Sequence, residues 1–264
     1  MKKRTLSVII LTKNEESMIA DCLSSVSFAD EIVVVDNYSA DSTVEIAKKQ
    51  HAKVISTNAA SFSIRREIGL QKASNTYIFY IDADERVSPE LKNEIQDFLS
   101  SSKDTDAFIV KRQNYYLGKN PWPKIENFPR FFKRTSLKGW RGDLHESPIF
   151  NGTQGEFSGY IEHFTHRNFS SMVAKTNEWS DVEAKLRFDA SHPKMSWWRF
   201  PRVMMGAFYD SFVTQRGFKA GKVGFMESAY QSFSIFITYA KLWELQANQV
   251  NAVKSTHKRE KLLQ

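Results

Sequence analysis

The stretch YIFYIDADERVSPELKNEIQDFL, residues 77–99, passes from an apolar run through a group of carboxylates into a helix start. The apolar and aromatic residues 77–81 predict a strand that is covered on both faces. Ser88-Pro89-Glu90 supplies a capping hydroxyl, a proline in the first turn and an acid near the helix N-terminus. A buried strand that leads directly into a helix is typical of the βα units of a parallel sheet.

The first hundred residues repeat this alternation of strand and helix. Continuous apolar runs at residues 6–11, 31–36, 52–56 and 77–82 are separated by segments with helical spacing of apolar residues. The pattern predicts an α/β domain built on a parallel sheet. Right-handed crossovers place the loops that follow the strands along one edge, where such sheets bind ligands.

Polar clusters stand at the carboxyl ends of three of the predicted strands. They are Thr12-Lys13-Asn14-Glu15, Asp36-Asn37-Tyr38-Ser39 and Asp82-Ala83-Asp84-Glu85. Because parallel strands end at the same edge of a sheet, we expect the three clusters to converge there.

The carboxylates Asp82 and Asp84 are the most informative pair. Residues two apart at a strand end point to the same side, and adjacent carboxylates repel each other unless a proton or a cation intervenes. Since Mg²⁺ binds one or two carboxylates together with substrate phosphates, the pair predicts a metal–diphosphate site. The alternative is a solvated turn whose acids lie before the next helix. Glu85 has two matching interpretations, as an outer support of the metal site or as the solvated end of the strand.

Other polar residues near this edge also allow two interpretations. Asp36 follows three valines and is placed either to accept hydrogen bonds from a base or ribose, or to cap the next helix. Arg65 and Arg66 begin a predicted helix and offer guanidinium donors to phosphate, or they form a solvated basic face. No G-x-G-x-x-G follows the first strand, which disfavours a dinucleotide site, and a P-loop motif is also absent.

Histidines gather after residue 139. His145 and Glu146 lie in GWRGDLHESP, residues 139–148, where a carboxylate beside an imidazole suits a general base or a surface ion pair. His163 and His166 are three residues apart in a predicted strand or loop, which is a weak metal-ligand pattern. We expect both of these histidines to be structural.

The bulk composition limits the partners. The chain has 264 residues and a formal charge of +7, which favours phosphate-bearing molecules, nucleic acid or an acidic membrane surface. The single cysteine, Cys22, excludes an internal disulfide and a cysteine-based zinc site. No run of 18 apolar residues is present, so no spanning helix is expected. We expect a cytoplasmic protein, with a peripheral position on the inner face of the cytoplasmic membrane as an option.

Four segments together resemble an inverting family 2 glycosyltransferase with the GT-A fold, a Rossmann-like and mostly parallel sheet flanked by helices. They are LSVIILTKNEE (6–16), EIVVVDNYSADST (31–43), RREIGL (65–70) and YIDADERVSP (80–89), which occur in the order that is usual for the family. The resemblance covers about residues 5–150. As a set these segments are specific, although any one of them alone is not.

A narrower resemblance implies roles for individual residues. IDADERVSPEL, GDLHE and the aromatic C-terminus are similar to the bacterial subgroup that adds glucose to the heptose of the lipopolysaccharide inner core. The resemblance implies a UDP-sugar donor, Mg²⁺ or Mn²⁺ on Asp84, and Glu146 as the catalytic base. The implied donor-binding residues are Thr12, Asn14, Glu15, Asp36, Arg66 and Asp82, with His145 and Glu85 as outer supports. Glu67 departs from the asparagine that is frequent in the family.

The same resemblance suggests how the chain is divided. Residues 1–195 form the expected catalytic domain, with a nucleotide-sugar half at 1–100 and an acceptor half at 101–195. Residues 196–264 form an aromatic, basic and helical region. Such a region suits contact with an anionic membrane surface, which would bring the enzyme to a lipid-linked or other glycan acceptor. The alternative is a helical cap that completes the core.

Three rival functions remain at this stage. One is a UDP-sugar transferase with another acceptor, such as capsule, exopolysaccharide or a protein glycan. A nucleotidyltransferase is disfavoured because Thr-Lys-Asn-Glu-Glu stands where a Gly-rich basic loop is usual. A nucleic-acid-binding module would fit the charge and the aromatic residues, yet it would not explain acidic strand ends on one edge. No nucleic-acid partner is expected.

Overall fold

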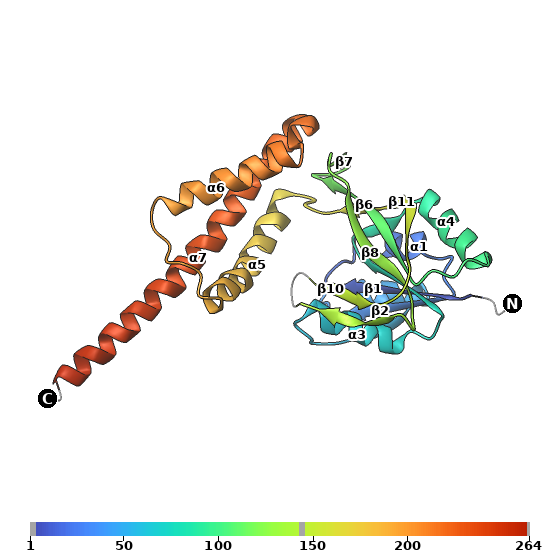
Figure 1. Ribbon diagram of the computed structural model, residues 1–264, viewed down its shortest axis with the longest axis horizontal. Helices are drawn as coiled ribbons and strands as arrows, with labels where there is room; N and C mark the ends of the chain where they lie inside the picture. Colours follow the sequence, from blue (N-terminus) through green and yellow to red (C-terminus); the bar gives the residue numbers. More distant parts are fainter. Residues whose placement is uncertain (1–3, 143–145, 263–264) are drawn as a thin grey trace. The chain divides into compact units, whose positions relative to one another are not determined.

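The computed structural model describes residues 4–142 and 146–262, with side chains as far as residue 249. The chain divides into two compact units (Figure 1). We call Met1–Asn114 with Ile125–Phe164 the sheet unit, and Tyr115–Lys124 with Thr165–Gln264 the helical unit. The expected boundary at residue 195 therefore differs from this division, which assigns residues 165–195 to the helical unit.

The sheet unit is built on one curved sheet with the strand order β3-β2-β1-β4-β8-β6-β11-β5. Strands β3, β2, β1 and β4 are parallel, as the apolar runs predict, and β8 then pairs antiparallel with β4 and β6. The strands are β1 (Leu6–Thr12), β2 (Glu31–Asp36), β3 (Lys53–Ser56), β4 (Tyr77–Asp82), β5 (Glu85–Val87), β6 (Ala107–Tyr116), β8 (Glu126–Lys133) and β11 (Gln154–Phe164). The short β7 (Asn120–Pro121) pairs with the end of β6, and β9 (Leu137–Arg141) pairs with β10 (Ser147–Phe150).

Both faces of the parallel strands are buried, which explains why their sequences are continuously apolar. On β1, Val8 and Ile10 face a core formed with α1, α2 and α4, whereas Ile9 and Leu11 face a second core formed with α3 and the β9–β10 hairpin. The helices are α1 (Ile19–Ser25), α2 (Thr43–Lys49), α3 (Phe62–Lys72) and α4 (Pro89–Ser100). The predicted cap of α4 is confirmed, because the Ser88 hydroxyl accepts a hydrogen bond from the Leu91 amide at 3.2 Å.

Helix α3 lies unusually close to the sheet because residue 69 is glycine. A Cβ atom at this position would come within 2.5 Å of Ile9 Cγ2 and 3.2 Å of Val35 Cγ2. The close approach brings Arg65 and Arg66, one turn earlier on α3, into the buried region beside β4. The segment RREIGL thus joins a packing residue to two buried arginines.

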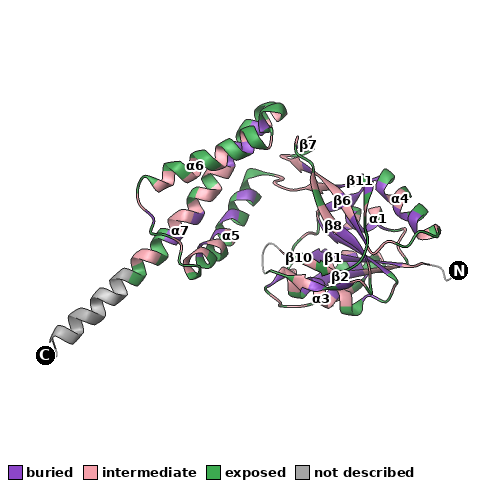
Figure 2. Ribbon diagram, viewed as in Figure 1, coloured by how far each residue is buried: buried purple, intermediate pink, exposed green. Residues whose placement is uncertain are grey.

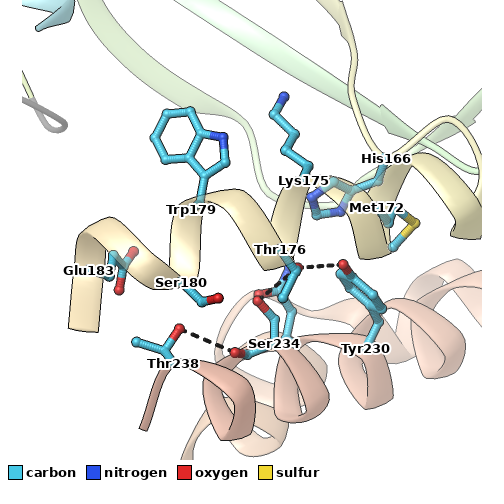
Figure 3. A pocket seen from close by; sticks show the side chains of 11 residues that line it. His166, Met172, Lys175, Thr176, Trp179, Ser180, Glu183, Tyr230, Ser234 and Thr238 are labelled. Carbon is cyan, nitrogen blue, oxygen red and sulfur yellow. Dashed lines mark hydrogen bonds between the residues drawn. The ribbon is translucent and has the colours of Figure 1, made fainter. Parts of the chain in front are cut away.

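The helical unit consists of α5 (Phe169–Asp189), α6 (Arg199–Tyr209), the π-turn η1 (Asp210–Thr214), the 3₁₀ turn η2 (Gly217–Ala220) and α7 (Gly221–Leu262). Helix α5 packs on α7 through hydroxyl and small residues. Figure 3 shows Thr176 of α5 bonded to the hydroxyls of Tyr230 and Ser234 of α7, beside a cavity of about 280 Å³.

This packing explains why the boundary falls earlier than residue 195. The residues of α5 that are buried are Met172, Thr176, Ser180 and Ala184, spaced four apart. A stripe of mainly polar and small residues lacks the pattern of an apolar helix face, so the packing of α5 on α7 was not predicted. Within the described residues, no helix combines the length and the hydropathy needed to cross a bilayer.

Candidate active site

The strand register brings the three polar clusters together at one edge, as expected from the sequence. Thr12 of β1 lies opposite Asp36 of β2, and Leu11 of β1 lies opposite Asp82 of β4. Asp36 is 1% exposed, and its Oδ2 accepts a hydrogen bond from the Ser39 amide at 3.0 Å. The three strand ends therefore form one continuous polar edge.

The loops after β1 and β2 are tied to each other. Asn14 has a φ of +55°, a left-handed conformation that asparagine tolerates better than most residues. Its amide donates to Ser39 Oγ, and its Oδ1 accepts from the Ala40 amide, both at 2.8 Å. The Glu15 amide donates to Thr43 Oγ1 at 2.8 Å. Asn14, through its amide and its side-chain oxygen, and Glu15, through its amide, thus tie the two loops together.

The hydroxyl of Thr12 is buried at this edge. Thr12 is 4% exposed, and Oγ1 has no hydrogen-bond partner among the described residues. Buried polar atoms without a partner are uncommon, and a bound ligand is one way to satisfy them.

Arginines meet the carboxylate at the end of β4. Asp82 Oδ1 lies 3.4 Å from Arg66 Nη2, and its Oδ2 lies 3.4 Å from Arg130 Nη2. Burial raises the pKa of Asp82, but Arg130 and then Arg66 outweigh it, so the pKa is held below its usual range. Asp82 is therefore ionised and already paired with protein cations.

Glu85 is a buried anchor. Its side chain is 0% exposed, which excludes the interpretation of Glu85 as a solvated strand end. Its Oε2 accepts from the Asp82 amide at 2.9 Å, and its Oε1 lies 3.3 Å from Arg112 Nη1 and 3.5 Å from Arg130 Nη2. Burial opposes the charge on Arg130, yet Glu85 and Asp82 raise the pKa of this arginine. Glu85 therefore holds the two arginines and the turn after β4 in place.

Arg66 joins this group to Glu146. Arg66 Nε and Nη2 lie 2.8 Å and 2.7 Å from Glu146 Oε1, and the guanidinium lies over Tyr80 and Trp140, 5.5 Å and 4.9 Å from the ring centroids. Arg66 Nη1 is buried without a partner among the described residues. The structure thus brings Glu146 to the edge where Asp82 lies, although they are far apart in the sequence.

A second chain of contacts orients His163. Glu126 Oε2 accepts from Arg112 Nη2 and from Asn114 Nδ2, each at 2.8 Å, and Asn114 Oδ1 lies 2.7 Å from His163 Nδ1. Burial raises the pKa of Glu126, but Arg112 outweighs this and lowers it, so Glu126 is an acceptor only. Asn114 must then turn its oxygen towards His163, and Nδ1 of the imidazole must donate.

The position of the proton on His163 Nδ1 determines which form of His163 Nε2 faces Asp84. In a neutral imidazole with its proton on Nδ1, the other nitrogen carries a lone pair. His163 Nε2 lies 3.4 Å from Asp84 Oδ2. A lone pair and a carboxylate oxygen at this distance suit a shared cation. The chemistry of these two donors fits Mn²⁺, which takes both imidazole and carboxylate ligands, and Mg²⁺, which prefers oxygen.

Several of these residues had no predicted role. His163 was expected to be structural, and Arg112, Glu126 and Arg130 lay in segments interpreted only as strands or loops. A signal was present in DAFIVKRQN and PRFFKR, because arginines inside aromatic strands need buried partners. His145, expected near Glu146, lies outside the described residues. Within the described part of the chain no group of three or more His, Cys, Asp or Glu side chains could hold a metal ion.

The comparison with known families decides the class of this protein. The sequence profile described as Glycosyl transferase family 2 matches residues 7–171. The chain belongs to this family. A glycosyltransferase of Rickettsia typhi, named as uncharacterized, is 30% identical over 271 residues, covering 97% of this chain and 91% of that protein. The resemblance seen in the four sequence segments is confirmed.

Two further proteins are similar to the chain. The lipopolysaccharide core biosynthesis glycosyltransferase LpsC of Rhizobium meliloti is 24% identical over 258 residues, covering 93% of this chain and 94% of LpsC. Among solved structures, Staphylococcus aureus TarS 1–349 in complex with UDP has a TM-score of 0.47 at 14% identity, covering 93% of this chain and 92% of TarS 1–349. The predicted class, a glycosyltransferase with an α/β fold of the GT-A type and a helical C-terminal extension, is confirmed.

Proposed function

We propose that this glycosyltransferase moves a sugar, with glucose as the first candidate, from a UDP-sugar to a lipopolysaccharide-core or other cell-envelope glycan, with inversion at the anomeric carbon. One observation carries the proposal. His163 Nε2 faces Asp84 at 3.4 Å, on the same polar edge as Asp82, Asp36 and the unsatisfied Thr12 hydroxyl. An edge of this kind suits a nucleoside diphosphate with a divalent cation.

Asp84 and His163 are the proposed holders of Mg²⁺ or Mn²⁺. Two protein ligands suit an ion that completes its shell with substrate phosphates and water. A cation held there supplies charge neutralisation for the departing diphosphate. Asn114 would keep the His163 lone pair aimed at the ion, in the way that outer contacts orient metal-bound histidines.

The nucleotide would lie along the strand ends. We assign Asp36 to the uracil or ribose and Asp82 to the ribose or to the surroundings of the metal. Thr12, Asn14 and Glu15 would form the floor of this site, with the Thr12 hydroxyl free to bond the nucleotide. Arg66 would stabilise charge on the diphosphate, since guanidinium groups bind phosphate in a bidentate way.

Glu146 is the proposed general base, and its contact with Arg66 links it to the proposed diphosphate site. A bound diphosphate would compete with Glu146 Oε1 for the Arg66 guanidinium and would leave the Glu146 carboxylate available to the acceptor. Glu146 then takes the proton of the acceptor hydroxyl as that oxygen bonds to the anomeric carbon, and the bond from this carbon to the diphosphate oxygen breaks.

The acceptor assignment rests on the name of one relative. LpsC is named as a lipopolysaccharide core biosynthesis glycosyltransferase, and it aligns over 93% of this chain. We therefore favour a lipid-linked core glycan over capsule, exopolysaccharide or protein glycans. A lipid-linked acceptor would place the enzyme on the inner face of the cytoplasmic membrane as a peripheral protein.

A donor screen tests the proposal. Hydrolysis and transfer would be measured for several UDP-sugars with Mn²⁺, Mg²⁺ or a chelator, using the wild type and Asp84→Asn. We expect UDP-glucose turnover that the chelator abolishes, and a decrease of at least about 10²-fold for Asp84→Asn because the electrostatic stabilisation of the leaving group is lost. Unchanged turnover in the chelator, or by Asp84→Asn, would contradict the metal assignment.

A further inference from the structure

Residues 190–226, which contain α6, η1, η2 and the first turns of α7, carry a one-sided charge. This segment has six bases, Lys194, Arg199, Arg202, Arg216, Lys219 and Lys222, and one acid, Asp210, so its formal charge is +5. Asp210 Oδ2 accepts a hydrogen bond from Gln215 Nε2 at 2.7 Å. In the part of the chain with described side chains, no ion pair joins Arg202, Arg216 or Lys222 to an acid, and all three are exposed.

One face of α6 packs on α7. Ser232 Oγ of α7 donates to the Met204 carbonyl at 2.8 Å, and Phe200 lies 5.8 Å from Phe236 between ring centroids. Phe208, one turn further along α6, contacts Phe225. Residues 200, 204 and 208 are four apart and therefore form one stripe directed at α7.

The opposite face of α6 is apolar and open to solvent. Trp198, Arg202, Met205 and Tyr209 follow each other at helical spacing on this face. Met205 is 65% exposed, Tyr209 is 62% exposed, and Trp197 just before the helix is 83% exposed. No residue of α6 is buried, as the green and pink colouring of this helix shows (Figure 2). Large aromatic residues so exposed are unusual on a protein that is surrounded only by water.

The turn between α6 and α7 also combines exposed aromatic residues with basic residues. Phe212 lies 5.3 Å from Phe208 and 6.3 Å from Phe218 between ring centroids. Phe218 and Phe225 remain 50% and 54% exposed, although they belong to this group. Arg216, Lys219 and Lys222 surround the group in the sequence. We call these residues and the open face of α6 the basic aromatic surface.

We infer that the basic aromatic surface docks on an anionic lipid bilayer, with its aromatic side chains in the headgroup region. Tryptophan and tyrosine are favoured at membrane interfaces, and lysine and arginine are attracted by anionic headgroups. An apolar stripe interrupted by a base is also the pattern of helices that lie in the interface plane. A second copy of this chain is a poor occupant, because two surfaces of charge +5 repel each other.

The inference rests on the proposed function in one respect: membrane docking would bring the enzyme to a lipid-linked acceptor. Vesicle binding needs no sugar donor, and donor hydrolysis needs no vesicle. Failure of the docking and failure of the proposed reaction are therefore separate results.

Flotation with vesicles tests the electrostatic part. The full chain would be mixed with phosphatidylcholine vesicles, or with vesicles that contain about one quarter phosphatidylglycerol. The variant Arg216→Glu/Lys219→Glu/Lys222→Glu is compared with a control, Lys48→Glu/Lys49→Glu/Lys103→Glu, which alters exposed lysines of the sheet unit. Each substitution removes two units of charge, so both triples lower the formal charge from +7 to +1.

We expect the wild type to bind anionic vesicles and to prefer them over neutral ones. The first triple should weaken this binding at least about 10²-fold, because each of the three bases near an anionic surface contributes about fivefold. The control should retain most of it. Equal loss in both triples, or equal binding of the wild type to neutral and anionic vesicles, would overturn the inference.

A second pair of variants tests the aromatic part. Trp197→Ser/Met205→Ser/Tyr209→Ser should lose anionic-vesicle binding, whereas Val173→Ser/Val182→Ser/Leu186→Ser, at exposed positions of α5, should keep it. Circular dichroism and donor hydrolysis without vesicles should be unchanged in all variants, which shows that the sheet unit is intact. Retained binding by the first variant, or a dimer in sedimentation velocity that this variant abolishes, would overturn the inference.

Discussion

The sheet unit buries the arginines that contact Asp82, and the helical unit exposes the bases around α6 and the start of α7. Arg66 and Arg130 are 3% and 7% exposed and contact Asp82, Glu85 or Glu146. Arg202, Arg216 and Lys222 are exposed, and none of these three pairs with an acid in the part of the chain with described side chains. A buried charge acts through the position of its partners, so its loss should change catalysis or folding. An exposed charge acts through the field around it, so its loss should change where the protein binds.

Substitution of Glu146 should have the largest effect in the sheet unit. Glu146→Gln keeps the shape of the side chain and a contact to Arg66, but it removes the group that would accept the proton. We expect kcat to decrease about 10²–10⁴-fold, the usual contribution of a general base. Circular dichroism should show that the variant stays folded. Near-normal turnover would exclude Glu146 as the base and direct attention to Asp143, which lies outside the described residues.

Removal of a buried arginine tests the comparison directly. Arg130→Met leaves Asp82 and Glu85 with fewer cationic partners in a buried place, and breaking such a pair destabilises a protein by about 3–5 kcal/mol. Arg216→Met, a matched change at an exposed position, should change stability by no more than about 0.5 kcal/mol. Urea unfolding followed by circular dichroism measures both. Similar losses of stability in the two variants would remove the distinction between the two regions.

The pH dependence of Tm tests whether charge explains the loss of stability in Arg130→Met. The pKa of Asp82 lies below its usual range in the folded protein, so its stabilisation is present above about pH 4 and is lost as the pH falls through the folded pKa. In Arg130→Met this carboxylate has one cationic partner fewer, so less of the stabilisation is present to be lost. The difference in Tm between wild type and variant should therefore stay nearly constant from pH 7 to about 4 and narrow below about pH 4, where the wild type loses the contribution of Asp82. A difference that stays constant below about pH 4 would mean that packing, and not charge, explains the loss.

The contacts of His163 should have a smaller and more specific effect. Asn114→Leu removes the acceptor that fixes the proton on Nδ1, so we expect Mn²⁺ affinity to fall about 10–100-fold by calorimetry. NMR of the imidazole nitrogens should show mixed tautomers in the variant and one tautomer in the wild type. Gln113→Leu, which changes the neighbouring residue on the opposite face of β6, should leave both readouts unchanged. One tautomer in the Asn114→Leu protein would contradict the proposed orientation.

The parallel strands β1 and β4 could be predicted from the sequence because nearly all successive residues along them are buried. The runs LSVIIL and YIFYID predicted parallel strands correctly because both faces of each strand are buried. The meeting of Thr12, Asp36 and Asp82 followed from the parallel arrangement alone. Local sequence sufficed for both.

The arginine partners could not be predicted in the same way. Arg66 and Arg130 reach Asp82 from α3 and β8, and Arg112 reaches Glu85 from β6. The contacts of Arg130 and Arg112 depend on antiparallel pairings between distant strands, whose register no local pattern determines. The positive charge near Asp82 was therefore expected to be a cation, whereas Arg66 and Arg130 contact Asp82 in the structure.

The smallest effect is expected for a glycine-to-alanine substitution, made once in the sheet unit and once in the helical unit. Gly69→Ala places a Cβ 2.5 Å from Ile9 Cγ2 beneath α3, and overpacking of this kind costs about 1–3 kcal/mol, partly offset by a gain of about 1 kcal/mol in helix propensity. Gly206→Ala lies in α6, where a new Cβ meets no atom within 4 Å among the described residues, so only the propensity gain remains. Calorimetry should show a lower Tm for Gly69→Ala and an equal or higher Tm for Gly206→Ala. A decrease for both would mean that α6 is packed more tightly than its exposed face indicates.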